Sequence, residues 1–172
     1  MSTLKVDTIQ HSGGTTGLTI DSTGRILQPA KPAFRARIAG SSSAHGDTGT
    51  LVFETEDFDI GGNYNTSTGI FTAPISGIYH FMFRAITATN ASGAENASND
   101  SALGDFYKNG SICSGTRFYA YVNGASFHAT FNGITLQQLS ASDEIKVVIG
   151  GEYVYSDANA HWDPVFEGYL VG

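Results

Sequence analysis

The segment Gly61–Phe83, GGNYNTSTGIFTAPISGIYHFMF, constrains the fold more than any other part of this chain. Its glycines and its proline predict a strand–turn–strand corner, followed by a further strand over Gly77–Arg84. Side chains alternate between the two faces of a strand. Here one face would carry Tyr79, Phe81 and Phe83, and the other Ile78, His80 and Met82. A sheet with one face in water is not apolar on both sides, so we expect the second face to be covered by another copy of the chain.

Composition favours a β fold. The 172 residues include 21 glycines, 11 phenylalanines and 8 tyrosines, and only 15% are charged, which is typical of a single sandwich or barrel. The single Cys113 excludes a disulfide framework within the chain. A net charge of −7 argues against a nucleic-acid partner. The sequence shows no signal peptide and no apolar run of the length that spans a bilayer, so we expect synthesis in the cytosol without membrane insertion.

Residues 1–31 differ in character from the rest. Short apolar pairs are separated by SGGTTG and DSTG, which predict turns. Such a segment buries too little surface to fold alone, so it needs a partner, either two sister chains or a larger particle. Pro29 and Pro32 favour extended backbone and mark a boundary. We therefore expect an attachment and trimerising segment over 1–31 and a separate head over 32–172.

The head reads as a succession of short β segments divided by glycine or small polar clusters. The expected strands are Phe34–Ile38, Leu51–Phe53, Ile70–Ala73, Ile78–Ile86, Leu103–Lys108, Phe118–Val122, Phe127–Leu139, Ile145–Ile149, Tyr153–Tyr155 and Val165–Val171. About ten strands with wide excursions between them predict an all-β jelly-roll sandwich. The longest excursion, Ala88–Ala102, is almost free of large apolar residues and predicts a surface loop.

Several ordered motifs in the head resemble a known family. They are PAFRA at 32–36, NYN at 63–65, TGIFTAP at 68–74, GIYHF at 77–81, YKNG at 107–110, the turn Leu139…Asp143-Glu144-Ile145, and FEGYL at 166–170. In this order they resemble the complement-1q-like globular head, over residues 32–172. That resemblance implies a ten-stranded jelly roll similar to tumour necrosis factor, which assembles as a homotrimer through its inner sheet and acts as a binding module rather than an enzyme.

The resemblance also implies which side chains meet at the inner sheet and the trimer interface. The candidates are Phe34, Tyr79, Phe81, Phe131, Phe166 and Tyr169. The alternative for all of them is ordinary core packing within one chain. The sequence does not determine the register, so it does not decide which side chains face the core and which the threefold axis.

Departures from the family are informative too. The chain has no Gly-X-Y stalk, and Ser142-Asp143 stands where the family usually has Gly-Asp. Residues 1–31 instead resemble the leader LKVDTI…GGTT…TIDSTGR at the start of tail-fibre and other virion surface proteins of marine and cyanobacterial phages. Together the two resemblances imply a virion structural protein with a trimeric binding head.

Neither catalysis nor metal binding is predicted. The five histidines fall in no catalytic or zinc motif. The loop near Asp157, His161 and Asp163 and the acidic positions Glu95, Asp100 and Asp105 offer oxygen ligands suited to calcium. Some relatives bind calcium near the trimer apex, but no DxDxDG-type loop is present here, and solvated turn carboxylates are the favoured interpretation. We expect no cofactor and no metal ligands.

Two functions fit these observations. In the first, residues 1–31 attach to other virion proteins while head loops recognise a host surface glycan or outer-membrane protein. The expected receptor-facing loop residues are Asn90, Glu95, Asn96, Asn99 and Asp100. The aromatic segments Phe118–Tyr121 and Tyr153–Trp162 suit sugar faces as well as they suit a core. In the second, the trimer is a capsid decoration, or cement, protein that stabilises the shell, which the short chain favours.

Overall fold

A computed structural model describes residues 4–40, 43–45, 48–88, 100–122, 129–150, 153–156 and 162–172. Every regular element in these ranges is a β-strand, and all pairings are antiparallel, which confirms the all-β prediction. Within the same ranges, no helix is long and apolar enough to cross a membrane.

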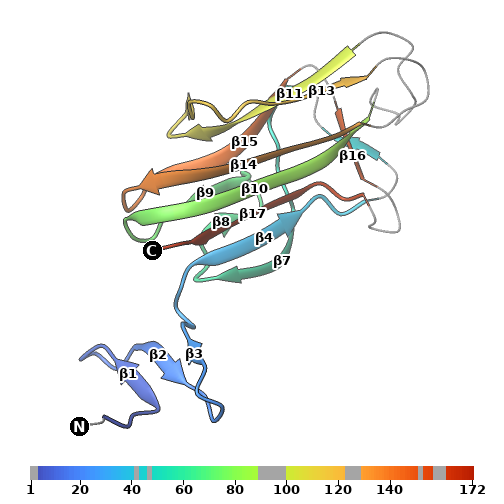
Figure 1. The fold of residues 1–172 in the computed structure, drawn as a ribbon. Helices are drawn as coiled ribbons and strands as arrows, with labels where there is room; N and C mark the ends of the chain where they lie inside the picture. The colour runs from blue at the N-terminus through green and yellow to red at the C-terminus, as the bar shows by residue number, and fades with distance from the viewer. Residues whose placement is uncertain are drawn as a thin grey trace.

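The strands form a small sheet near the amino terminus and two larger sheets in the body (Figure 1). The small sheet contains β1 (Thr8–Gln10), β2 (Thr16–Ile20) and β3 (Ile26–Leu27). We call the first body sheet the β10 sheet. Its strands are, in order, β5 (Ser43–His45), β16 (Tyr153–Ser156), β10 (Gly77–Ala88), β17 (Val165–Leu170), β4 (Ala33–Arg37) and β7 (Thr55–Ile60). Strand β14 (Thr130–Leu139) also pairs with β10.

The second body sheet, called the β15 sheet, packs against the first. Its order is β12 (Ser111–Ile112), β11 (Asp100–Lys108), β15 (Glu144–Gly150), β9 (Ile70–Thr72) and β8 (Tyr64–Asn65). Two further strands pair with it, β13 (Phe118–Val122) with β11 and β6 (Thr48–Thr50) with β15. The predicted corner in Gly61–Phe83 is present as β8, β9 and the start of β10.

Aromatic side chains fill the space between the two sheets. Phe34 is central: its ring lies 4.9 Å from each of the rings of Tyr64, Phe71 and Phe166. Phe81 lies 6.0 Å from Phe166. These rings come from strands of both sheets and bury large apolar areas, so the sandwich is stabilised mainly by aromatic packing within one chain.

Two glycines of the family motifs stand where a larger residue would collide with its neighbours. A Cβ at Gly168 would lie 2.5 Å from Cδ1 of Phe81, so only glycine lets β17 approach the aromatic core. Gly69 has a φ of +73° and sits against the backbone of Leu51, where a side chain would also collide. The sequence spacing of these glycines therefore reflects close packing between strands.

One expected strand is wrong, and several strands were not expected. Residues Leu51–Phe53 do not form a strand but connect β6 to β7, although Leu51 and Phe53 are buried in the core. The longest unexpected strand is β7, whose sequence TEDFDI is too acidic to be recognised as one. It lies at the sheet edge, where its acidic side chains reach solvent and the arginines of β4.

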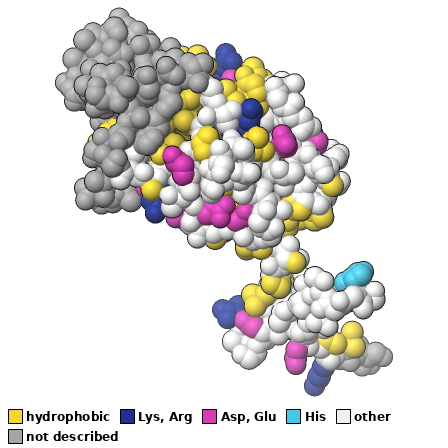
Figure 2. All heavy atoms as spheres, turned by 180° about the vertical axis from the view of Figure 1, so that it is seen from behind, with side chains coloured by type: hydrophobic (Ala, Val, Ile, Leu, Met, Phe, Trp, Pro, Cys, Tyr) yellow, Lys and Arg dark blue, Asp and Glu magenta, His cyan; other side chains and the backbone are white. Residues whose placement is uncertain are grey.

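The amino-terminal segment forms three short strands, which are separated by turns at the two places where the sequence predicts them. In the second turn, the Asp21 carboxylate accepts hydrogen bonds from Thr23 N at 2.8 Å, Thr23 Oγ1 at 2.7 Å and Arg25 N at 3.0 Å. The Thr23 hydroxyl is the main reason that the pKa of Asp21 is far below its ordinary value. This segment stands apart from the body (Figure 2). At the junction, Lys31 Nζ donates to the carbonyl oxygen of Val171 at 2.9 Å.

Candidate functional site

The two faces of β10 have different surroundings, and this settles the question of which side chains form the core. Tyr79, Phe81 and Phe83 point between the sheets and have no exposed surface. The alternate residues point away from the β15 sheet, onto what we call the outer face of the β10 sheet. Ile78 on this face is 46% exposed, and His80 and Met82 are half-buried.

The outer face carries rows of side chains that the strand register aligns. His80 lies between Leu136 of β14 and Tyr169 of β17. In the next row, Met82 lies between Ile134 of β14 and Glu167 of β17. Ile134 and Leu136 are 64% and 63% exposed, which is unusual for aliphatic residues in the interior of a strand. The β14 and β10 half of the outer face is therefore an exposed apolar surface.

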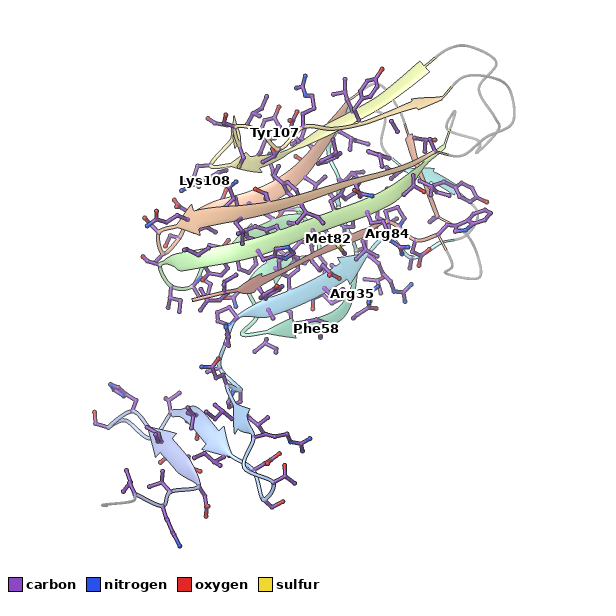
Figure 3. All side chains as sticks on the ribbon, viewed as in Figure 1. Arg35, Phe58, Met82, Arg84, Tyr107 and Lys108 are labelled. Carbon is purple, nitrogen blue, oxygen red and sulfur yellow. The ribbon has the colours of Figure 1, made fainter. Side chains whose placement is uncertain are left out.

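Charged residues occupy the other half of the outer face, on β4, β7 and β17. Arg35 Nε lies 3.3 Å from Asp57 Oδ2 and 3.6 Å from Glu167 Oε2. Arg37 donates to Asp57 Oδ1 at 2.9 Å and to Asp163 Oδ2 at 2.7 Å. These hydrogen bonds, the one to Asp57 first, raise the pKa of Arg37 above its ordinary value. Arg35, Met82 and Arg84 of this face are labelled in Figure 3 together with Phe58 of β7, which is 48% exposed.

The structure divides the six predicted inner-sheet and interface residues. Five of them, Phe34, Tyr79, Phe81, Phe131 and Phe166, are on the expected strands but are 0–2% exposed in the single chain. They pack between the two sheets of the single chain, which is the core-packing alternative that the sequence left open. Tyr169 alone is on the outer face, where its ring lies 5.0 Å from the imidazole of His80.

Sequence reasoning missed Ile134 and Leu136. A signal was present, since they alternate with Phe131 along the predicted strand Phe127–Leu139 at the spacing of two that separates faces. Both alternating sets are apolar in β10, however, so only the pairing of β14 with β10 shows which set is left outside.

The predicted receptor-facing loop cannot be placed. Asn90, Glu95, Asn96 and Asn99 lie outside the described residues, and Asp100 is described only as the first residue of β11. The two aromatic segments are divided between core and surface. Phe118 is buried, whereas Tyr119 is 57% and Trp162 49% exposed.

Two of the acidic residues considered for calcium are instead paired with arginines. Asp105 accepts from Arg117 Nη2 at 2.8 Å, and Asp163 accepts from Arg37. The part of the chain that the structure describes contains no group of three or more side chains arranged to hold a metal ion. Asp157, His161 and Glu95 fall outside that part.

Two family motifs, YKNG at 107–110 and the turn that contains Asp143, meet at the end of the sandwich near the carboxyl terminus. The Asp143 carboxylate accepts from Lys108 Nζ at 2.8 Å, from Asn109 Nδ2 at 2.7 Å and from Ser140 N at 2.8 Å. These bonds, the one from Lys108 first, lower the pKa of Asp143 to about 2. Asn109 in turn accepts from Glu144 N at 2.8 Å. The motif YKNG thus holds the turn that joins β14 to β15.

Taken together, the described residues define an antiparallel β sandwich with a jelly-roll type of architecture, an aromatic core and one exposed apolar outer face. The model of the C1q domain family matches residues 33–171, so the chain belongs to the C1q domain family. This confirms the resemblance that the motifs from Pro32 to Leu170 indicated for the head.

Named relatives agree with this assignment. The chain is 30% identical over 145 residues to the rat and human proteins named "Complement C1q tumor necrosis factor-related protein 5", which covers 83% of this chain and 54% of each relative. It therefore spans about half the length of these relatives.

Solved structures show the same fold at lower identity. The globular domain of the zebrafish complement 1qA protein matches with a TM-score of 0.60 at 19% identity, over 83% of this chain and 98% of that one. Murine APRIL, crystallised at pH 5.0, matches with a TM-score of 0.56 at 11% identity, over 81% of this chain and 99% of that one.

Proposed function

We propose that the head assembles as a homotrimer through the outer face of the β10 sheet. The observation that carries this proposal is the exposed apolar surface formed by Ile134, Leu136 and Ile78 beside Met82 and Tyr169. Covering it with the same surface of sister chains removes it from water, and the tumour-necrosis-factor-like fold supports closed threefold assembly. The charged half of the face then fixes the orientation of neighbouring chains.

The trimer, in this proposal, is a non-enzymatic structural protein of a tailed phage virion, a tail-fibre or adhesin type of head that recognises the host surface. Residues 1–31 attach it to other virion proteins. Support comes from the resemblance of this segment to phage leaders and from its shape: a small sheet that stands apart from the body and exposes Leu4, Ile9, Ile26 and Leu27. The partner on the host is a surface glycan or an outer-membrane protein.

The end of the sandwich away from the leader is the recognition end in this proposal. The leader and the carboxyl terminus both lie at the opposite end (Figure 1), so a head anchored through residues 1–31 presents its distal end outward. The expected loop residues Asn90, Glu95, Asn96 and Asn99 follow β10, which ends there. Neither nucleic acid, membrane insertion nor a cofactor has a part in this function.

Localisation on intact particles tests the proposal. Antibodies against the purified chain should label the tail, and the full chain should bind susceptible but not resistant host cells. Labelling of the whole capsid shell would instead support the capsid decoration function. In that case the copy number per virion should be far above the small multiples of three that are expected for fibres. A mass corresponding to one chain at micromolar concentration would contradict the trimer.

A further inference from the structure

A hollow of about 330 Å³ opens in the body where β10 and β14 approach the distal end of the sandwich. It is lined by Arg84, Ala85, Ile86, Thr130, Trp162 and Asp163. Ile86 and Thr130 are cross-strand partners, and Trp162 and Asp163 lie shortly before β17, so three segments far apart in sequence contribute. The volume suits a single small ligand rather than a polypeptide.

Asp163 is one of the residues that line the hollow, and its carboxylate has an unsatisfied acceptor. Its side chain is 3% exposed, and one carboxylate oxygen, Oδ2, accepts the 2.7 Å hydrogen bond from Arg37. The other oxygen, Oδ1, is buried and has no hydrogen-bond partner among the residues that the structure describes. Buried charged oxygens without a partner are rare because desolvation is costly. A donor delivered by a ligand in the hollow would satisfy this oxygen.

Arg84 gives the hollow a free donor. Its side chain is exposed, and no ion pair joins it to the described residues. On the outer face, Asn132 of β14 is the cross-strand partner of Arg84. Arg37 of β4 lies in the same row, on the far side of β17. The hollow therefore lies beyond the apolar rows that the proposed trimer covers, where the face becomes polar.

Trp162 supplies a flat apolar wall. Its indole is 49% exposed and lies 6.1 Å from the ring of Tyr155, to which it is inclined by 53°. Ala85 and Ile86 add aliphatic surface, and Thr130 adds a hydroxyl that both donates and accepts. A pyranose ring has the complementary structure, hydroxyl groups around its edge and an apolar face of C–H groups.

We propose that this hollow binds one neutral pyranose residue of a host-surface glycan. A sugar hydroxyl donates to Oδ1 of Asp163, Arg84 donates to sugar oxygens, and the apolar face of the ring lies against Trp162. An acidic sugar is disfavoured because its carboxylate would approach the uncompensated oxygen of Asp163. This inference rests on the proposed host-recognition function and names the ligand class for it.

The single tryptophan of the chain makes the test direct, because intrinsic indole fluorescence reports on Trp162 alone. The full chain is titrated with the methyl pyranosides of glucose, galactose, mannose and N-acetylglucosamine. At least one should change the emission saturably at millimolar concentration, which is the affinity expected for a ligand of about a dozen heavy atoms. The corresponding uronic acids should bind more weakly.

Two variants locate the effect. Arg84→Met keeps an unbranched apolar side chain and removes the donors, so it should weaken the sugar affinity about tenfold. Lys5→Met removes a charge in the leader, far from the hollow, and should leave the affinity unchanged. Absence of a saturable change with all four sugars, or an unchanged affinity in Arg84→Met, overturns the inference.

Cell binding separates this inference from the function on which it rests. If the wild-type chain and Arg84→Met bind host cells equally well, adhesion stands and the pyranose site is wrong. If the wild-type chain binds no host cells, adhesion itself fails, whatever the sugars show. Loss of cell binding in Arg84→Met, with the same thermal stability as the wild type, supports both.

Discussion

The two faces of β10 are both apolar in sequence, yet only one of them is covered by other strands of the same chain. The core face carries Tyr79, Phe81 and Phe83, which are fully enclosed by the second sheet of the same chain. The outer face carries Ile78, His80 and Met82, whose neighbours Ile134 and Leu136 remain exposed. The difference teaches that one strand can serve folding on one side and association on the other, so neighbouring residues should respond to substitution in different ways.

Substituting adjacent residues gives the largest expected contrast. Phe81→Ala leaves a cavity among the core rings and should lower the free energy of unfolding by about 3–5 kcal/mol. Met82→Ala, one residue further along the strand, removes side-chain atoms from the outer face and should cost less than about 1 kcal/mol in the isolated chain. Denaturant titration at low protein concentration measures both. Equal costs would remove the distinction between the faces.

A charge on the outer face should affect association instead of folding. Leu136→Glu would bury an unpaired carboxylate between chains, which should destabilise the trimer by about 3–5 kcal/mol. The mass from sedimentation should fall from three chains to one while the thermal stability of the monomer is retained. Thr72→Glu, at an exposed position of the β15 sheet, is the matched control and should keep the trimer. A trimer that persists in Leu136→Glu would place the interface elsewhere.

The tight packing behind β17 offers a second test of the core face. In Gly168→Ala the new Cβ would lie 2.5 Å from Phe81 Cδ1, and the Phe81 ring is packed against the rings of Phe106 and Phe166. Overpacking of this kind should cost about 1–3 kcal/mol. Denaturant unfolding measures the loss. An unchanged stability would mean that the core rings move more easily than their packing indicates.

The turn after β14 fixes which side chains of that strand face outward, and Asp143 holds this turn. Because the pKa of Asp143 is lowered from 3.8 to about 2 in the folded chain, its carboxylate contributes stability above pH 3.8 that is lost as the pH falls through about 2. Asp143→Asn should lower stability at neutral pH and flatten the pH dependence in this window. Unfolding curves recorded at decreasing pH should converge for the two proteins near pH 2.

The smallest effect is expected next to Asp143. Ser142 has a φ of +72°, a left-handed conformation that strains residues with a Cβ. Ser142→Gly, which restores the Gly-Asp usual in the family, should raise the free energy of unfolding by about 0.5–1 kcal/mol. A decrease would show that the serine hydroxyl has a stabilising contact that outweighs the strain.

Much of the fold followed from the sequence, because its signals are local. Alternation in β10, the turn glycines and the ordered motifs predicted the all-β sandwich and the C1q-like head. Strand β7 did not follow, since the acidic side chains of TEDFDI indicate a loop unless the arginines of β4 that pair with them are known. The sequence wrongly predicts a strand at Leu51–Phe53, because burial and strand formation give the same apolar signal.

The candidate site was predicted less well. Which face of β10 is the core depends on pairing with β14 and β17, residues about 50 to 90 positions away, and on a second sheet. The hollow at Arg84 depends on three separate segments meeting, and single-sequence patterns carry no such information. Local patterns therefore predicted strands well and surfaces poorly.

The leader enters the head at Lys31, directly before β4, and β4 is held along its length by β17 and β7. The strands of the β10 sheet run between the leader end and the distal end (Figure 1). A mechanical pull between these ends acts along the strands and perpendicular to the hydrogen bonds that join them. Many bonds must then yield together rather than one after another, so the head should resist a force that pulls these two ends apart.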